Sequence, residues 1–258
     1  MEHLPFNSFS KNIHSQNGED GIISELLNQL KLKNSGDNWC VEFGAWDGIH
    51  LSNTFALVEH GWKAVYIEAD TARFQDLLKT AKRYPNIIPI KAIVSRYPND
   101  ENTLDRLLVD TNIPIHFDLL SIDIDSFDCD VWESLENYFP KIVVIEINSS
   151  VPPGIYWRNG PKTPGNTFSE TLRVGKEKGY TLVCHTGNMI FVKDELMHQL
   201  TFPSKFIKFP ELLFLDGFIS EGLFSATSKF NLKGLILSLV PRSILLILVK
   251  LKHFFVKS

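Results

Sequence analysis

Short apolar runs alternate with amphipathic stretches from Trp39 onward, and this alternation constrains the fold more than any other feature of the chain. Seven apolar runs have the length and composition of buried strands: 39–43, 64–68, 86–92, 117–124, 141–147, 180–185 and 189–193. Helical periodicity marks the stretches between them: 52–60, 71–84, 103–109, 131–138 and 167–178. Strands that alternate with helices are typical of βαβ units and a parallel sheet.

The last two runs are separated only by Thr186, Gly187 and Asn188, which is a signal for a tight turn. They therefore predict an antiparallel hairpin at the end of the sheet. We expect an α/β fold, a Rossmann-like, doubly wound, seven-stranded and mostly parallel sheet in a three-layer α/β/α arrangement. A chain of 258 residues buries roughly three quarters of its unfolded surface in one such domain, so it needs no disulfide or metal to fold.

Ahead of the first strand, a helical stripe of apolar residues predicts an N-terminal helix within residues 15–32, with Asp20 as its N-cap. The polar segment SQNGED (15–20) before it reads as the start of that helix. Residues 1–9 lack the basic and apolar regions of a signal peptide, so export is not expected. We assign residues 1–193 to one domain with its core over 39–193.

Cysteine usage indicates the compartment. The three cysteines, Cys40, Cys129 and Cys184, are odd in number and lie in or beside apolar runs, which argues against a disulfide framework. The longest apolar stretches, 235–240 and 244–249, are far shorter than the roughly 20 residues that span a bilayer. We therefore expect a cytoplasmic protein.

The net charge of −4 is unevenly distributed, because the five basic residues after position 231 are accompanied by no acid. Residues 1–231 contain all 30 acidic residues and therefore carry a net negative charge. This charge disfavours nucleic acid as a partner, because nucleic-acid binding depends on basic residues that neutralise phosphates. The basic, apolar tail (232–258) has the composition of a helix in a membrane interface, which predicts peripheral contact with the inner face of the membrane. The alternative is a helix packed on the domain or on a second subunit of a homodimer.

A phenylalanine-rich segment precedes this tail. Seven of the 19 phenylalanines fall between positions 202 and 230, in the extension over 194–231. We expect this extension to cover the site, to form a dimer face or to approach lipid.

The carboxyl ends of the strands are the place to look for a site, because ligands of open α/β sheets bind there. The first strand runs into a glycine turn in VEFGAWDG (41–48), and Glu68 closes the second strand 20 residues after Gly48. An acid at that point can accept hydrogen bonds from both hydroxyls of a ribose. The pair indicates a cofactor that contains adenosine; the alternative is a structural turn beside a solvated glutamate.

S-adenosylmethionine fits these residues better than NAD does. The G-x-G-x-x-G spacing that places a helix N-terminus on a pyrophosphate is absent, and an acid, Glu42, precedes the turn. S-adenosylmethionine carries no phosphate and has a cationic sulfonium and ammonium, which suit an acidic rim.

Polar residues also close the fourth and fifth strands. Asp123 and Asp125 share one face of an extended segment, and Glu146 and Asn148 have the same spacing. Oxygen ligands of this kind suit Mg²⁺ or another divalent cation, with Asp125, Glu146 and Asn148 as the expected ligands. The alternatives are contacts to the amino group of the cofactor and caps of the following helices.

Taken together, residues 15–193 resemble the FkbM-type family of class I S-adenosylmethionine-dependent methyltransferases. The resemblance lies in SQNGED (15–20), VEFGAWDG with SNT (41–54), YIEAD (66–70), LLSIDIDSFD (119–128) and VVIEIN (143–148). It implies a cofactor-binding set of Glu42, Gly44, Asp47, Gly48, Asn53, Glu68 and Asp123. Trp46 and Ser126 depart from the family pattern, since glycine is frequent at both positions, and Asp125 replaces a glutamate.

The resemblance also implies O-methylation of a sugar hydroxyl in a glycan, polysaccharide or glycosylated metabolite. The hydroxyl must lose its proton, and Asp125 and His185 are the catalytic candidates, with His50 comparably placed. The 18-residue loop over 149–166 is long enough to be functional. We expect Tyr156 and Trp157 to stack on the sugar acceptor and Arg158 to meet its acidic groups; the alternative is a mobile loop.

Two other classes of function stay open. A nucleotide-sugar oxidoreductase or epimerase is disfavoured, because no tyrosine has a lysine four residues later and the glycine loop has the wrong spacing. The third class is a non-catalytic, membrane-recruited binding module that retains the fold.

Overall fold

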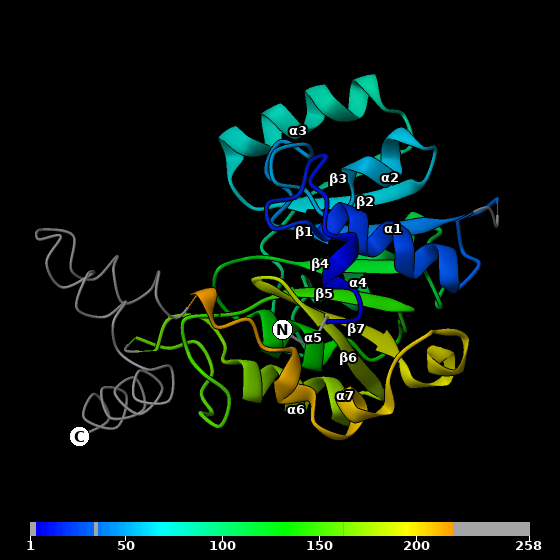
Figure 1. Cartoon of the computed structure of the whole chain (residues 1–258). Helices are drawn as coiled ribbons and strands as arrows, with labels where there is room; N and C mark the ends of the chain where they lie inside the picture. The colour runs from blue at the N-terminus through cyan, green and yellow to red at the C-terminus, as the bar shows by residue number, and fades with distance from the viewer. Residues whose placement is uncertain (1–3, 34–35, 162, 219–258) are drawn as a thin grey trace, which may run out of the picture.

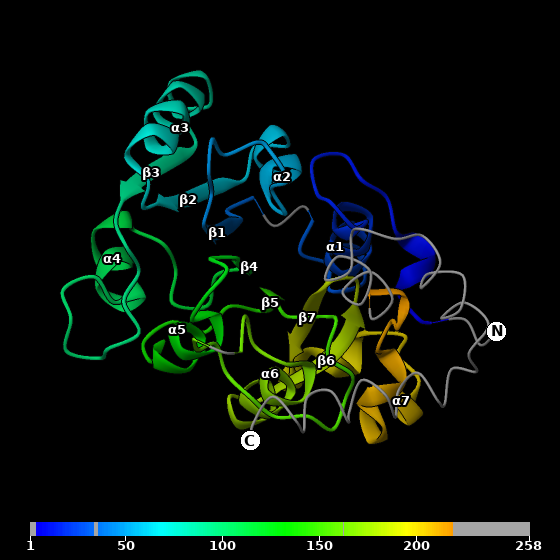
Figure 2. The same ribbon diagram turned by 90° about the vertical axis from the view of Figure 1, so that its left-hand side faces the viewer.

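The structure is a computed structural model, and it describes residues 4–33, 36–161 and 163–218. Its centre is one sheet of seven strands in the order β3-β2-β1-β4-β5-β7-β6, which Figure 2 shows in succession. Only β7 runs antiparallel to its neighbours. The strands are β1 Trp39–Phe43, β2 Lys63–Glu68, β3 Ile87–Lys91, β4 Leu119–Ile122, β5 Ile142–Glu146, β6 Tyr180–His185 and β7 Asn188–Lys193.

Helices cover both faces of the sheet (Figure 1). The α-helices are α1 Glu19–Gln29, α2 Phe55–Glu59, α3 Thr71–Arg83, α4 Leu104–Leu108, α5 Asp128–Ser134, α6 Phe168–Glu177 and α7 Ser204–Lys208. Short 3-10 helices are η1 Asn7–Phe9, η2 Val109–Thr111, η3 Asp194–Gln199 and η4 Pro210–Leu213. The predicted doubly wound α/β/α fold with its C-terminal antiparallel hairpin is confirmed.

Two apolar clusters hold the layers together, one on each face of the sheet. Side chains of α1, α2 and α3 pack on one face, and those of α4, α5 and α6 pack on the other. The central strands β1 and β4 are buried along their whole length, as their continuous apolar sequences require. This burial fixes the carboxyl ends of the central strands side by side at one edge of the sheet.

Three predicted helix starts are wrong: α2 begins at Phe55, three residues after its predicted start, and acidic side chains explain the other two. Gly18, with φ +94°, is the N-cap of α1, whereas Asp20 lies in the first turn. The Asp20 carboxylate accepts hydrogen bonds from the backbone N–H groups of residues 13–15 and so folds the preceding segment into a loop. Helix α5 begins at Asp128, three residues early, because the Asp128 carboxylate accepts the N–H groups of Ile124 and Ser126.

The first part of the phenylalanine-rich extension packs on the sheet. Phe206 and Phe214 join the same apolar cluster as α6, and the ring of Phe214 stacks on His185 at 4.9 Å. The rest of this extension and the tail over 232–258 lie outside the described residues. Within the described part of the chain, no helix has the length and apolar character that crossing a membrane requires.

Candidate functional site

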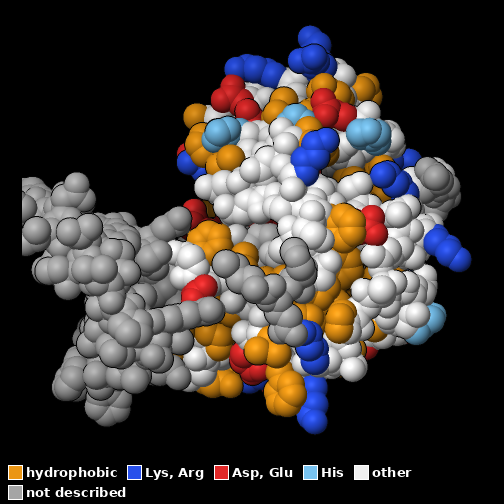
Figure 3. Space-filling view, in the orientation of Figure 1, with side chains coloured by type: hydrophobic (Ala, Val, Ile, Leu, Met, Phe, Trp, Pro, Cys, Tyr) orange, Lys and Arg blue, Asp and Glu red, His pale blue; other side chains and the backbone are white. Residues whose placement is uncertain are grey.

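A cleft of about 590 Å³ lies at the carboxyl ends of β1, β2, β4 and β5, and we call it the main cleft. Its charged and titratable lining side chains are Glu42, Glu68, Asp123, Asp125, Glu146, Arg73 and His50. Five carboxylates therefore face a single guanidinium in this cleft. On the face that Figure 3 shows, lysine and arginine side chains are scattered over the surface, including its top. Such a cleft attracts a cationic ligand and repels phosphates.

The glycine turn after β1 comes into direct contact with the end of β4. Gly44 has a φ of +79°, and a Cβ atom on it would lie 1.7 Å from the carbonyl oxygen of Asp123. Only glycine fits this approach. Trp46 also has a positive φ, of +50°, and the Arg73 guanidinium lies over its ring at 4.0 Å. The turn thus has a fixed shape and an aromatic side chain at the rim of the cleft.

Glu42 holds the second half of this loop in place. Its carboxylate accepts hydrogen bonds from the Ser52 hydroxyl at 2.6 Å, from the Thr54 hydroxyl and from the Asn53 backbone N–H. Burial raises the pKa of Glu42. The Asn53 amide in turn donates to the Ser121 hydroxyl on β4. Glu42 reaches the floor of the main cleft, whereas Asn53 does not line it.

Glu68 closes β2 with its carboxylate almost fully buried. One oxygen accepts the Trp46 N–H at 2.8 Å, and the other accepts the Asp70 N–H at 2.6 Å. Because a carboxylate oxygen can accept two hydrogen bonds, each keeps acceptor capacity for a ligand hydroxyl. Glu68 also lines the main cleft.

Asp47 and Gly48 shape the turn without lining the cleft. Asp47 accepts the backbone N–H groups of Ile49 and His50 at 2.9 and 2.8 Å. Gly48, with φ +81°, lies against Tyr66 and Leu77, so that an added Cβ would approach Leu77 to 2.9 Å. Of the predicted cofactor-binding residues, the structure brings Glu42, Gly44, Glu68 and Asp123 together around the main cleft.

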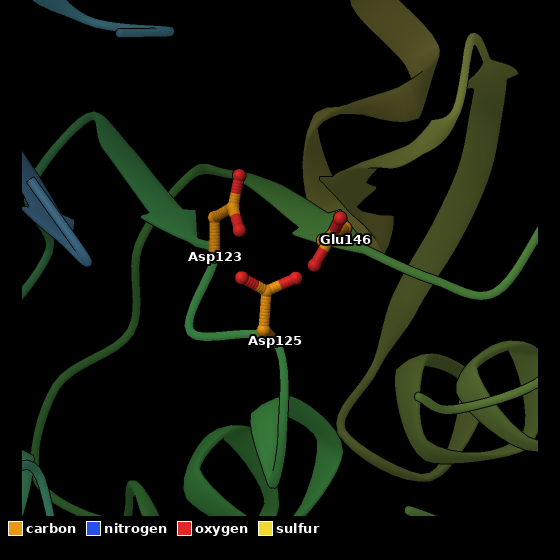
Figure 4. Close-up of side chains that lie close together, drawn as sticks. All are labelled: Asp123, Asp125 and Glu146. Carbon is orange, nitrogen blue, oxygen red and sulfur yellow. The ribbon is translucent and has the colours of Figure 1, made fainter. Parts of the chain in front are cut away.

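Asp123, Asp125 and Glu146 form a carboxylate cluster at the inner end of the main cleft. Asp123 follows β4, Asp125 lies in the next turn with φ +56°, and Glu146 ends β5. Figure 4 shows their carboxylates pointing toward one another, and their ligand atoms all lie within 4.8 Å. Burial, and then repulsion among the carboxylates, raises the pKa values of Asp123 and Glu146. The cluster therefore suits binding of a proton or another cation.

Asn148 does not join this cluster. Its side-chain oxygen accepts from the backbone N–H and the hydroxyl of Ser150, and its amide donates to the Pro164 carbonyl at 2.8 Å. The Asn148 side chain thus holds the loop over 149–166, which speaks against its predicted role as a metal ligand.

His185 lies in the core and does not line the main cleft. Its Nδ1 accepts the Leu215 N–H at 2.9 Å, which places the proton on Nε2, and Nε2 donates to the Ser149 hydroxyl at 2.9 Å. Burial lowers the pKa of His185 to about 3, so the ring stays neutral. Both nitrogens are occupied, and this arrangement corrects the predicted catalytic role: His185 is a packing residue.

The loop over 149–166 is tied to the helices by Arg158. Its guanidinium pairs with Asp130 at 3.0 Å, with Glu133 at 2.7 Å and with Glu170 at 2.9 Å. Tyr156 is exposed, Trp157 is half-buried, and neither they nor Arg158 line the main cleft. Tyr156, Trp157 and Arg158 therefore lie away from that cleft, and their predicted acceptor contacts have no geometric support there.

Sequence reasoning missed two contributors to the site. Gln16 lines the main cleft because the Asp20 carboxylate folds residues 13–15 into a loop. The position of Gln16 within the SQNGED motif was the one sequence feature that could have indicated a role in the site. Arg73 reaches Trp46 from the first turn of α3, and nothing in the sequence pattern distinguished it from the other basic residues of that helix.

No protein-family model matches the chain, and no curated protein sequence matches it either. Among solved structures, the chain is similar to the CMeT domain of the citrinin polyketide synthase, with a TM-score of 0.46 and 12% identity over 68% of this chain. It spans 51% of that structure's length.

Two further solved structures resemble the chain. One is the N-terminal domain of EvdMO1 in the presence of SAH and D-fucose, with a TM-score of 0.44 and 11% identity over 71% of this chain and 84% of that one. The other is a SAM-dependent methyltransferase from Aquifex aeolicus, with a TM-score of 0.39 and 12% identity over 65% and 86% of the two chains.

Proposed function

We propose that the chain is an S-adenosylmethionine-dependent O-methyltransferase that acts on a sugar hydroxyl of a glycan, polysaccharide or glycosylated metabolite. One observation carries the proposal: five carboxylates line the main cleft, and Glu68 stands among them beside the glycine turn. A sulfonium and an ammonium both suit this negative potential, and a ribose suits Glu68. A dinucleotide would bring a pyrophosphate into the same carboxylates, which disfavours the oxidoreductase or epimerase alternative.

The FkbM-type resemblance is supported by where its motifs fall. Each of the five motif segments contributes a residue to the lining of the main cleft. The contributing residues include Gln16, Gly44, Glu68, Asp123 and Glu146. Segments spread over more than half of the chain thus meet at one place, which is expected if they serve one ligand.

When bound in the main cleft, the cofactor would supply the methyl group to the acceptor oxygen. Glu68 would hold the ribose, and Glu42 would keep the turn in position from below. Asp125, at the exposed end of the carboxylate cluster, would take the hydroxyl proton, with Asp123 and Glu146 next to it. Proximity and orientation then provide much of the acceleration for such an in-line transfer.

A divalent cation is a second component that we propose for this site. Asp123, Asp125 and Glu146 would hold it, because their oxygens converge and oxygen ligands are those that Mg²⁺ prefers. A bound cation would lower the pKa of the acceptor hydroxyl. Binding is measured directly by calorimetric titration of MgCl₂ or MnCl₂ into the protein, and heat retained in Asp125→Asn would contradict these ligands.

Calorimetric titrations with S-adenosylhomocysteine and NAD test the choice of cofactor. We expect binding of the first and none of the second, and the reverse result would contradict the proposal. Transfer of a labelled methyl group to cell-envelope glycans then separates an enzyme from a non-catalytic module.

Asp125→Asn tests the proton acceptor. We expect it to abolish transfer and to retain cofactor binding, with Asp110→Asn as the matched control on the exposed end of α4–η2. Turnover at the wild-type rate in Asp125→Asn would refute the role of Asp125.

Peripheral attachment to the inner face of the membrane is a separate proposal, which rests on the composition of residues 232–258. Deletion of these residues should abolish co-flotation with vesicles that contain anionic lipid. Flotation that persists after the deletion would remove the membrane proposal, and a change in sedimentation instead would favour a homodimer contact.

A further inference from the structure

A second cleft, of about 410 Å³, opens beside the main cleft. The two clefts share Gln16, Asp123 and Glu146. The residues that complete the lining of the second cleft include Asn17, Asn148, Ser149, Ser150, Asn188 and Phe218. Because two carboxylates of the cluster form the shared wall, ligands in the two clefts would meet at these side chains.

The lining of the second cleft favours an uncharged, hydrogen-bonding ligand. Amide and hydroxyl side chains dominate it, and its described residues include no lysine or arginine. Asp123 and Glu146 would repel phosphate or carboxylate groups that entered. Phe218 offers a ring on which a flat apolar face can stack.

Two amides of this cleft are available to a ligand. Asn148 and Asn188 are already engaged, since their amides donate to the Pro164 carbonyl and to Glu19. The side chains of Gln16 and Asn17, by contrast, have no hydrogen-bond partner among the described residues. Their backbone is held in place, because Glu19 accepts the Asn17 N–H at 2.8 Å and Asp20 accepts the Ser15 N–H at 2.8 Å.

Such an arrangement is pre-organised, which lowers the ordering cost of binding. We propose that the second cleft binds the methyl acceptor, an uncharged polyhydroxylated molecule, with the Gln16 and Asn17 amides as its hydrogen-bonding partners. This inference rests on the proposed methyltransferase function, and it moves the acceptor away from Tyr156, Trp157 and Arg158.

The positions of the two clefts are consistent with a balanced transfer. The acceptor oxygen forms a bond to the methyl carbon as the bond from that carbon to the sulfonium sulfur breaks. The sulfur keeps the electron pair and becomes a neutral thioether, and the hydroxyl proton passes to a carboxylate of the cluster. Asp123 and Glu146 lie in the shared wall, and Asp125, the proposed proton acceptor, lines the main cleft next to them.

Saturation-transfer NMR with neutral methyl glycosides, in the presence of saturating S-adenosylhomocysteine, tests the proposal. We expect saturation of the methyl glycosides and none of hexose 6-phosphates. A Gln16→Ala, Asn17→Ala double variant should weaken glycoside binding by about tenfold or more, as expected for two lost hydrogen bonds. Gln75→Ala, on the exposed face of α3, is the matched control and should leave binding unchanged.

Ser150→Phe provides a second variant, since Ser150 lines only the second cleft and a phenyl ring there would fill it. Affinity for S-adenosylhomocysteine must be retained in Ser150→Phe, because Ser150 does not line the main cleft, and the circular dichroism spectrum of the double variant must match that of the wild type, which shows that the double variant is folded. Loss of glycoside binding in Tyr156→Ala but not in the double variant would overturn the proposal, as would an absence of glycoside saturation in a wild-type protein that binds S-adenosylhomocysteine. A wild-type protein that does not bind S-adenosylhomocysteine would instead refute the proposed function.

Discussion

Replacement of Gly44 by alanine gives the most direct test of how the main cleft is built. The added Cβ would lie 1.7 Å from the Asp123 carbonyl oxygen, whereas ordinary contacts begin at 3.4 Å. The turn and the end of β4 must therefore separate by roughly 1.7 Å before normal contact returns. Neither partner is a flexible side chain, so the backbone itself has to move.

Two costs add in this variant. A non-glycine residue in the left-handed region costs about 1–2 kcal/mol, and overpacking a close contact costs about 1–3 kcal/mol. We therefore expect Gly44→Ala to lower the free energy of unfolding by about 2–5 kcal/mol. Displacement of a positioning element by about 1 Å costs roughly 100-fold in rate, so methyl transfer should fall at least that far.

Gly179→Ala is the matched control, because Gly179 has a φ of +80° and no atom within 4 Å of its Cβ position. It carries the backbone cost alone, about 1–2 kcal/mol. Urea unfolding measures the free energy of unfolding of both variants. Calorimetry measures their affinity for S-adenosylhomocysteine, which reports whether the main cleft is intact. If Gly44→Ala matches Gly179→Ala in stability and binds this ligand with wild-type affinity, the close contact does not shape the site.

Five further predictions follow from the side-chain contacts. Glu68→Gln should weaken S-adenosylhomocysteine binding at least about tenfold in calorimetry, because hydrogen bonds to a charged group contribute about 1.5–3 kcal/mol, and unchanged affinity would refute the ribose contact. The rate of methyl transfer should fall with falling pH at a midpoint well above the ordinary carboxyl value of roughly 4, because the pKa values of Asp123 and Glu146 are raised and only the deprotonated cluster takes a proton. Because these pKa values are higher in the folded than in the unfolded chain, the ionised cluster lowers the free energy of unfolding at neutral pH, and this effect disappears as the pH falls towards roughly 4. The substitution Glu146→Gln should therefore stabilise the ligand-free protein against urea at pH 8 and change little at pH 4. Arg158→Ala should lower stability by about 1–2 kcal/mol without changing the KM for the acceptor, since it removes the ion pair of Asp130 and the shorter ion pair of Glu133, whereas Glu170 keeps its pair with Arg173. His185→Ala should cost about 2–4 kcal/mol through lost stacking and two unpaired polar groups, and a shift in the pH profile of the rate would contradict its assignment as a packing residue.

The sequence predicted the sheet well, because each strand is an uninterrupted apolar run between turn signals. All seven strands lie within two residues of their predicted bounds, including the hairpin around Gly187. Helix ends were predicted less well where a side chain, and not periodicity, sets the boundary. Asp20 and Asp128 both accept N–H groups from residues that precede them in the chain, and such contacts leave no mark in hydrophobic spacing.

For the candidate site too, some residues were predicted from the sequence and others were not. Strand-end acids such as Glu68 and Asp123 were found because parallel strands place their carboxyl ends at a common edge. His185 and Arg158 were misjudged because their roles depend on partners far along the chain, Leu215 for one and Asp130 for the other. Residue type and strand position cannot show that such a side chain is already engaged.

The two ends of the described chain meet over the last strands of the sheet. Asn7 donates a hydrogen bond to the His185 carbonyl at 3.0 Å, and the ring of Phe6 stacks on that of Phe202 at 6.1 Å. These contacts join residues nearly two hundred positions apart, and contacts of such separation are slow to form because a large loop must close first. During synthesis, the segment around Phe6 is made first, and its partners His185 and Phe202 are added only after most of the chain has been translated. The chain therefore completes its core only after residue 214 has left the exit tunnel, and a partly made chain exposes the apolar surface that Phe6, Phe202 and Phe214 later cover.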